Sequence, residues 1–268
     1  MMIAKRIVRS ALLMAGAVAT LVQVALAQAV SGAMGGGAMG GGAMSGGAMG
    51  GGAMKSDKAA MKDGMMAKDD GAVEYTVVVK SRWTAANFPV EYPPKGLVTG
   101  PHHSGLIGAS HNASYAIVRE GAAPTPGLER LSEEGKHAPL DAEIKAAIAK
   151  GSAGMLFESG PLRDFGDSIV TTVKVSGTHP LVDFVMMIAP SPDWFTGATS
   201  VDLRENGGWA RSRTVEMSAW DSGGDDGETY LAPDKDNVPK KATMKAMNRH
   251  FLQGGKPGVI ATVTFTRK

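Results

Sequence analysis

Short runs in which apolar and polar residues alternate recur from about residue 73 onward, and they limit the chain to a β-rich fold. In the first run, at 73–80, the side chains of Val73, Tyr75, Val77 and Val79 fall on one face, the period-two pattern of a half-buried strand. Similar runs occur at 115–119, 168–176, 181–188, 200–204, 213–217 and 259–266. The pattern predicts seven or eight short strands.

Helical signals are few. Only 126–134 and 140–150 show them, and in the second Ile144 and Ile148 share a face while Gly151 offers a C-terminal stop. A doubly wound sheet needs a helix after most strands, so this pattern disfavours it. We expect an all-β domain at 73–268, an antiparallel β-sandwich of about eight strands with one or two short helices.

The first 27 residues have the organisation of a signal peptide. Lys5, Arg6 and Arg9 precede an apolar run, and Ala25-Leu26-Ala27 is the small-x-small pattern that a signal peptidase cuts. An uncleaved anchor is the alternative, but the apolar run is short for a membrane span of ~20 residues and no stop-transfer charges follow it. We therefore predict cleavage after Ala27, no stable membrane span afterwards, and a secreted or periplasmic protein.

The composition of residues 28–72 predicts a disordered spacer. A five-residue Gly-Ala-Met repeat runs to Met54, and mixed charge follows from Lys55 to Asp70. Glycine at this density makes an ordered backbone too costly for the small apolar surface available. Methionine thioethers are ligands for Cu(I), so the repeat could bind copper. A low-complexity repeat without a ligand is the simpler interpretation of the methionine spacing.

Charge and cysteine content exclude several classes of function. Loss of the three basic residues of the leader takes the formal net charge from +2 to −1, which gives no electrostatic reason to bind nucleic acid. The chain contains no cysteine. Disulfides, thiol catalysis and cysteine-bound zinc are therefore excluded.

Two acidic loops are the strongest functional signal. Asp193 follows a strand in a Pro/Ser-rich turn, and Asp221 and Asp225 flank two glycines that allow a tight loop. Carboxylates on such loops are the hard oxygen ligands that calcium prefers. A meander of the runs from 168 to 217 would place these loops at one end of the sandwich, with Asp164 and Asp167 within reach. Alternatively, each Asp serves only as a turn-former.

The order of motifs along the chain resembles the spondin N-terminal domain family. The motifs are Phe88-Pro89, Tyr92-Pro93-Pro94, His103-Ser104-Gly105-Leu106-Ile107-Gly108-Ala109-Ser110-His111, Glu134-Gly135, Pro190-Ser191-Pro192-Asp193-Trp194-Phe195, and Trp220-Asp221 with Asp225 and Gly227. This domain occurs in the extracellular-matrix adhesion proteins F-spondin and mindin and in many bacterial relatives. The similarity runs from about residue 74 to residue 267.

The resemblance implies a β-sandwich that binds Ca²⁺ through aspartates, at positions that match Asp193, Asp221 and Asp225 here. It also implies a secreted module for adhesion or ligand binding, with an extracellular protein or glycan as partner. The chain lacks the cysteines usual in the animal proteins, and Asp226 extends the acidic motif. The 268 residues contain no thrombospondin-type repeat, and we therefore expect the matrix and integrin roles of the animal proteins not to carry over.

The histidines leave a second function class open. His102, His103 and His111 could in principle form a metal site with open coordination, and with the acidic loops this would make a periplasmic metal-dependent hydrolase. They lack the helical spacing of metallohydrolase motifs, and no Gly-x-Ser-x-Gly elbow is present. We therefore expect His111 to order a loop and the protein not to be an enzyme.

Aromatic residues accompany the acidic loops. Trp194, Phe195, Trp209 and Trp220 could stack against a ligand, but large aromatics at loop roots more often fill the end of a sandwich. We expect the core role.

Overall fold

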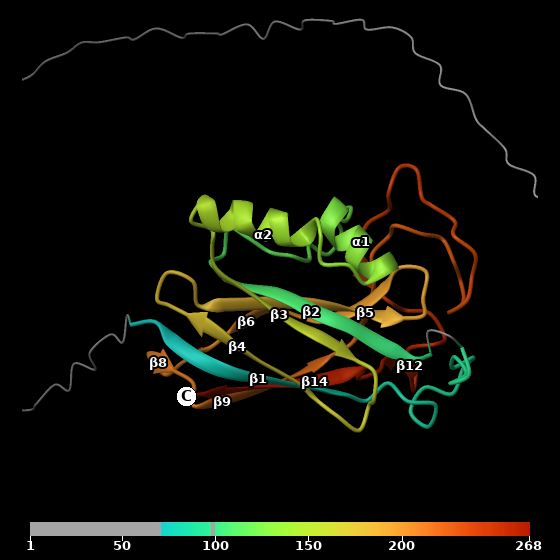
Figure 1. Ribbon diagram of the computed structural model, residues 1–268, viewed down its shortest axis with the longest axis horizontal. Helices are drawn as coiled ribbons and strands as arrows, with labels where there is room; N and C mark the ends of the chain where they lie inside the picture. Colours follow the sequence, from blue (N-terminus) through green and yellow to red (C-terminus); the bar gives the residue numbers. More distant parts are fainter. Residues whose placement is uncertain (1–70, 98–99) are drawn as a thin grey trace, which may run out of the picture. The chain divides into compact units, whose positions relative to one another are not determined.

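Two antiparallel sheets pack face to face in the described part of the chain, residues 71–97 and 100–268 of a computed structural model (Figure 1). The four-stranded sheet has the order β4 (Ile169–Val175), β1 (Val73–Ser81), β14 (Ala261–Arg267), β9 (Ser212–Met217). The six-stranded sheet has the order β11 (Met244–Lys245), β10 (Ala219–Asp221), β6 (Trp194–Asp202), β5 (Leu181–Ala189), β2 (His102–His111), β3 (Ala153–Leu162). Two small ribbons pair β7 (Arg204–Glu205) with β8 (Gly208–Trp209) and β12 (Leu252–Gln253) with β13 (Lys256–Pro257).

The predicted all-β sandwich is confirmed. The leader and nearly all of the spacer, predicted at 1–27 and 28–72, lie outside the described residues. Among those that are described, no helix has the length and apolar character needed to cross a membrane.

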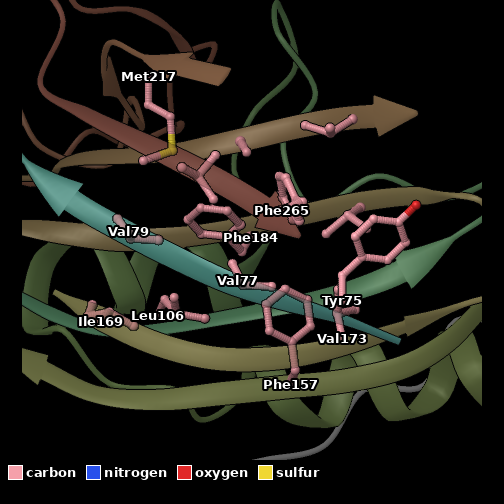
Figure 2. Packing of buried hydrophobic residues seen from close by; sticks show 14 of the residues in the cluster. Tyr75, Val77, Val79, Leu106, Phe157, Ile169, Val173, Phe184, Met217 and Phe265 are labelled. Carbon is pink, nitrogen blue, oxygen red and sulfur yellow. The ribbon is translucent and has the colours of Figure 1, made fainter. Parts of the chain in front are cut away.

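The main core lies between the sheets. Tyr75, Val77 and Val79 of β1 are completely buried, as the alternating pattern predicts. They face Phe184 of the six-stranded sheet, next to Phe265 of the neighbouring strand β14 (Figure 2). Apolar side chains from both sheets therefore form one cluster, the usual way a sandwich removes its inner faces from water.

Two helices cover the outer face of the six-stranded sheet (Figure 1). Helix α1 (Pro126–Glu134) starts at Thr125, whose Oγ1 accepts a hydrogen bond from the Leu128 amide, and ends at Gly135 in the left-handed conformation. Helix α2 is Leu140–Ala149. Leu131 and Ile144 pack on the sheet, so β2 and β5 are buried on both faces.

The sequence missed the two long strands β2 and β3, and it also missed the short strands β8, β10, β11, β12 and β13. Strand β2 carries His103, Ser104 and several glycines, and because both its faces are buried it lacks the alternation that marks a half-exposed strand. The run 115–119 forms no strand and belongs to the loop between β2 and α1. The strand expected at 200–204 is β6, which begins at Trp194.

The predicted meander is wrong. Strand β4 lies in the four-stranded sheet, β5 and β6 lie in the six-stranded sheet, β9 returns to the first and β10 to the second. The chain thus crosses between the sheets instead of continuing in one, and each sheet buries its inner face against the other.

A candidate metal centre in the acidic loops

Pairing of β10 with the start of β6 brings the two acidic loops together. Asp221 is opposite Trp194 in this ladder, and the Ser222 amide donates to the Asp193 carbonyl over 3.3 Å. The Trp194 amide donates to Ser191 Oγ at 3.1 Å, which closes the turn that carries Asp193. The predicted proximity of Asp193 and Asp221 is therefore found, although it arises from a ladder and not from a meander.

Asp193 is fully buried and uses its two carboxylate oxygens differently. Oδ2 accepts hydrogen bonds from Ser222 Oγ (2.9 Å), the Gly224 amide (2.9 Å) and the Asp225 amide (3.2 Å). Oδ1 is buried and has no hydrogen-bond partner among the described residues. Burial raises the pKa of Asp193, and the donors to Oδ2 partly oppose this rise. One oxygen holds the loops together, and the other is a buried acceptor without a donor.

Asp221 is half-buried beside Asp193. Its Oδ1 accepts a hydrogen bond from the Gly223 amide at 2.9 Å. Burial, and then the negative charge of Asp193, raises the pKa of Asp221 to about 6. The negative charges of Asp193 and Asp221 repel each other. A cation bound between the two carboxylates would remove this repulsion.

Asp225 shares the loop, but both of its carboxylate oxygens bond the backbone. Oδ1 accepts from the Gly227 amide at 2.6 Å and Oδ2 accepts from the Lys235 amide. In the described part of the chain, no three Asp, Glu or His side chains stand as metal ligands would. The structure thus gathers Asp193, Asp221 and Asp225 in adjacent loops, and a shared ion among them stays a prediction.

Glycines permit this close packing, as the sequence indicated. Gly223 has φ +82°, and a Cβ there would lie 2.5 Å from the Lys241 carbonyl oxygen. A Cβ at Gly224 would lie 2.5 Å from Glu133 Oε1. Side chains at either position would push the acidic loop away from its neighbours.

Glu133 of α1 is the site residue that sequence reasoning missed. Its Oε1 is buried without a hydrogen-bond partner in the described residues and lies against Gly224, whose amide donates to Asp193. Burial, followed by the charge of Glu129, raises the pKa of Glu133 to about 7. In the sequence it is one of two adjacent glutamates at a helix end, and only the packing of α1 against the loop distinguishes it.

A depression of about 650 Å³ opens beside the acidic loops. Its lining includes carboxylates and cations together with Trp194, Met244, Met247 and His250. His250 is buried, and its Nε2 lies 2.9 Å from Glu91 Oε2. The depression is thus lined by charged side chains of both signs together with the rings of Trp194 and His250.

The aromatic residues serve the core, as expected. Trp194, Phe195, Trp209 and Trp220 are each at most 8% exposed. Phe195 and Trp220 stack with ring centroids 6.1 Å apart, and Trp194 packs edge-on against Tyr230.

The histidines singled out in the sequence lie elsewhere. His103 is buried, and one of its ring nitrogens lies 2.9 Å from Ser81 Oγ. Burial lowers the pKa of His103 to about 4. His111 Nδ1 contacts the Asn112 carbonyl oxygen at 2.9 Å, and its Nε2 lies 2.9 Å from Asp183 Oδ1. It orders a loop, as expected. His102 lines a different depression, with Asp164.

Asp164 also stays apart from the acidic loops. Its Oδ1 accepts from the Gly166 amide at 2.9 Å, and its carbonyl accepts from the Asp167 amide. Both aspartates form the turn between β3 and β4 and line a depression other than that of Asp221. The expectation that they approach Asp193 followed from the meander and is wrong with it.

Comparison with known proteins places the chain in a family. The Spondin_N family profile matches residues 73–253. Spondin-2 of Rattus norvegicus is 33% identical over 168 residues, which is 62% of this chain and 50% of that protein. Spondin-2 of Homo sapiens is 31% identical over 169 residues, which again cover 62% of this chain and 50% of that protein. Spondin-1 of Bos taurus is 26% identical over 184 residues, which cover 64% of this chain and 21% of that protein. The chain spans about half the length of the spondin-2 proteins that it matches. The profile covers the acidic loops and most of both sheets, and the chain therefore belongs to the spondin N-terminal domain family.

Proposed function

We propose that this protein is a secreted binding or adhesion module whose acidic loops hold a calcium ion. The observation that carries the proposal is the buried, unpartnered Oδ1 of Asp193 beside the half-buried carboxylate of Asp221. Burying a carboxylate oxygen without a donor is costly unless a cation compensates for it. A divalent cation there would satisfy Asp193 and remove its repulsion with Asp221.

The donor set suits calcium. Asp193 and Asp221 supply hard oxygens, Asp225 is the third ligand that the sequence predicts, and Glu133 has a further unpartnered oxygen nearby. Calcium accepts carboxylate and carbonyl oxygens in flexible geometries, which a loop can supply. When bound, the ion would join the loop after β5 to the loop after β10, and its role would be to stiffen a surface.

Adhesion or ligand binding follows from family membership together with export. The leader-like residues 1–27 favour a place outside the cytoplasm, in the periplasm or beyond the cell. A binding module needs no catalytic group. His103 and His111, which could have been catalytic, form hydrogen bonds with Ser81 and with the Asn112 backbone. We propose an extracellular protein or glycan as the ligand of the module, and no enzymatic activity.

Calcium titration of the purified chain tests the proposal. Saturating calcium should raise the melting temperature by several degrees relative to excess chelator, because an ion at ~100 times its Kd stabilises a fold by about 2.7 kcal/mol. Asp221→Asn should weaken calcium binding at least about tenfold, since a charged ligand is lost. Asp164→Asn, in the separate turn, is the matched control. Identical melting curves with calcium and chelator would contradict the proposal.

A further inference from the structure

One lysine lies among the carboxylates beside the acidic loops. The Lys240 ammonium is 2.8 Å from Glu129 Oε1 and 3.3 Å from Asp236 Oδ1, and it donates to the Gly224 carbonyl over 3.2 Å. These oxygens come from α1, from the segment before Lys240 and from the loop after β10. An ammonium has three donors, so each can meet one of the three oxygens. The Lys240 side chain is 23% exposed, and these contacts hold its charge in place.

A single peptide group connects Lys240 to Asp193. The Gly224 carbonyl accepts from Lys240 and also from the Asn237 amide, the latter at 2.8 Å. The other end of the same peptide group, the Asp225 amide, donates to Asp193 Oδ2 over 3.2 Å. A donor on the carbonyl polarises a peptide group and makes the amide of that group a better donor. The ammonium therefore acts on Asp193 across one peptide group.

The charges that act on Glu133 show what the ammonium compensates. Burial, and then the negative charge of Glu129, raises the pKa of Glu133, and the charges of Asp236 and Asp193 raise it further. The positive charge of Lys240 has the opposite effect, so it reaches this buried carboxyl group. The hydrogen bond with Glu129 raises the pKa of Lys240 itself, which keeps the ammonium charged at neutral pH. One permanent cation thus lies among four carboxyl groups.

A permanent cation has two opposite effects on a site for calcium. When no ion is bound, it attracts the carboxylates and so offsets part of their mutual repulsion. When an ion binds among the same carboxylates, the ammonium repels it and weakens the binding. A neutral side chain of similar length would reverse both effects.

We propose that Lys240 is a built-in counter-ion, which lowers the calcium affinity of the acidic loops and stabilises them when calcium is absent. This inference rests on the calcium site proposed above. A purely structural role, in which Lys240 only ties α1 to the loop after β10, makes the opposite prediction for affinity. Loss of a structural tie would loosen the loop and weaken calcium binding, whereas loss of a counter-ion strengthens it.

Calorimetric titration of the full chain with calcium tests the sign. Lys240→Met keeps the length of the side chain without its charge, and the calcium affinity should rise at least about fivefold. Lys240→Arg keeps the charge, and the affinity should stay within about twofold of the wild type. Glu129→Gln removes a negative charge, and the affinity should fall about fivefold. Lys145→Met is the matched control, since it also removes an ammonium paired with an aspartate four residues before it, on the exposed side of α2.

Melting curves of the same variants test the effect on stability. In excess chelator, Lys240→Met should melt several degrees below the wild type, because the carboxylates then have no cation among them. Saturating calcium should narrow this difference, since the divalent ion supplies positive charge to the same groups. Should Lys240→Met be unfolded in chelator, calcium is expected to restore its fold. A variant that stays unfolded under both conditions would contradict the inference.

The affinities also separate this inference from the proposed function. Equal or weaker calcium binding by Lys240→Met, beside a wild type that binds calcium, overturns the counter-ion alone. If neither chain binds calcium, both proposals fail. Binding by Lys240→Met but not by the wild type would mean that the ammonium takes the place of the ion. That result would retain the counter-ion and overturn the proposed function.

Discussion

At the scale of single residues, Asp193 connects folding to the proposed ion. Its Oδ2 collects three donors from the loop after β10, and this fixes where Oδ1 lies. Asp221 and Glu133 add two more carboxyl groups, for which burial raises the pKa to about 6 and about 7. An acid with a raised pKa in the folded state stabilises the fold at low pH, and that contribution is lost as pH rises through the raised pKa.

Calcium binding should therefore release protons near pH 6. A cation favours the ionised carboxylates, so Asp221, with a pKa of about 6, should give up about half a proton on average at that pH. Affinity should increase from pH 5 to pH 7.5. Calorimetry in buffers of different ionisation enthalpy measures the release directly, and Asp221→Asn should reduce it. The same heat of binding in every buffer at pH 6 would contradict this assignment.

His111 and Asp183 form a buried pair away from the acidic loops. Both are fully buried, with Nε2 2.9 Å from Oδ1, and Asp183 Oδ2 also accepts from the Ile117 amide at 2.9 Å. Each ring nitrogen of His111 lies 2.9 Å from an oxygen, one of which carries the charge of Asp183, so the imidazolium form suits the site. Burial opposes the charged form, but the hydrogen bond and negative charge of Asp183, together with hydrogen bonds to the Asn112 and Tyr115 backbone, outweigh it and raise the pKa of His111.

The raised pKa predicts a sign for the pH dependence. The stabilisation by this pair should be complete below pH ~6.5, the unperturbed value for histidine, and should decrease as pH rises through the higher folded pKa. Asp183→Asn should cost about 3–5 kcal/mol of unfolding free energy at pH 6 and less at pH 8.5. Urea denaturation at both pH values measures the difference. Asp141→Asn, which breaks the exposed pair with Lys145, should cost under about 1 kcal/mol at either pH.

At the scale of elements, the acidic loop depends on its glycines. Gly223→Ala would place a methyl group 2.5 Å from the Lys241 carbonyl oxygen at φ +82°. We expect a cost of about 1–3 kcal/mol, seen as a lower melting temperature, together with weaker calcium binding because Asp221 and Asp193 would separate. Gly160→Ala on β3 is the control, since its Cβ would meet nothing within 4 Å. Equal effects of the two substitutions would show that the loop tolerates rearrangement.

Sequence patterns predicted a helix or strand correctly where a local signal, such as a capping residue or a two-residue alternation, was enough to define it. Helix α1 begins and ends where the pattern placed it, because Pro126 and Gly135 act as local signals. Strand β1 alternates as a half-buried strand must. Strand β2 was missed because α1 and α2 bury its outer face, and no local rule reveals a layer that comes from elsewhere in the chain.

At the scale of the whole molecule, the site was predicted in part and for the wrong reason. Asp193 and Asp221 do lie side by side, but through the β6–β10 ladder, which no periodicity encodes. Glu133 reaches the same place from α1, some 60 positions earlier in the chain. Long-range packing decides such a meeting, and the sequence alone offers no local signal for it.

The shared core predicts that both sheets unfold together. Phe184 of β5 is completely buried and packs against residues of β1 and β14 in the opposite sheet (Figure 2). Phe184→Ala should cost about 3–5 kcal/mol, because it removes apolar contacts and leaves a cavity that both sheets line. Val170→Ala, at an exposed position, should change the unfolding free energy by no more than about 0.5 kcal/mol. Urea unfolding followed by far-UV circular dichroism and by tryptophan fluorescence should give one coincident transition in each variant. Separate transitions for the two signals would show that the sheets are independent, and one core could not then stabilise the face that carries the acidic loops.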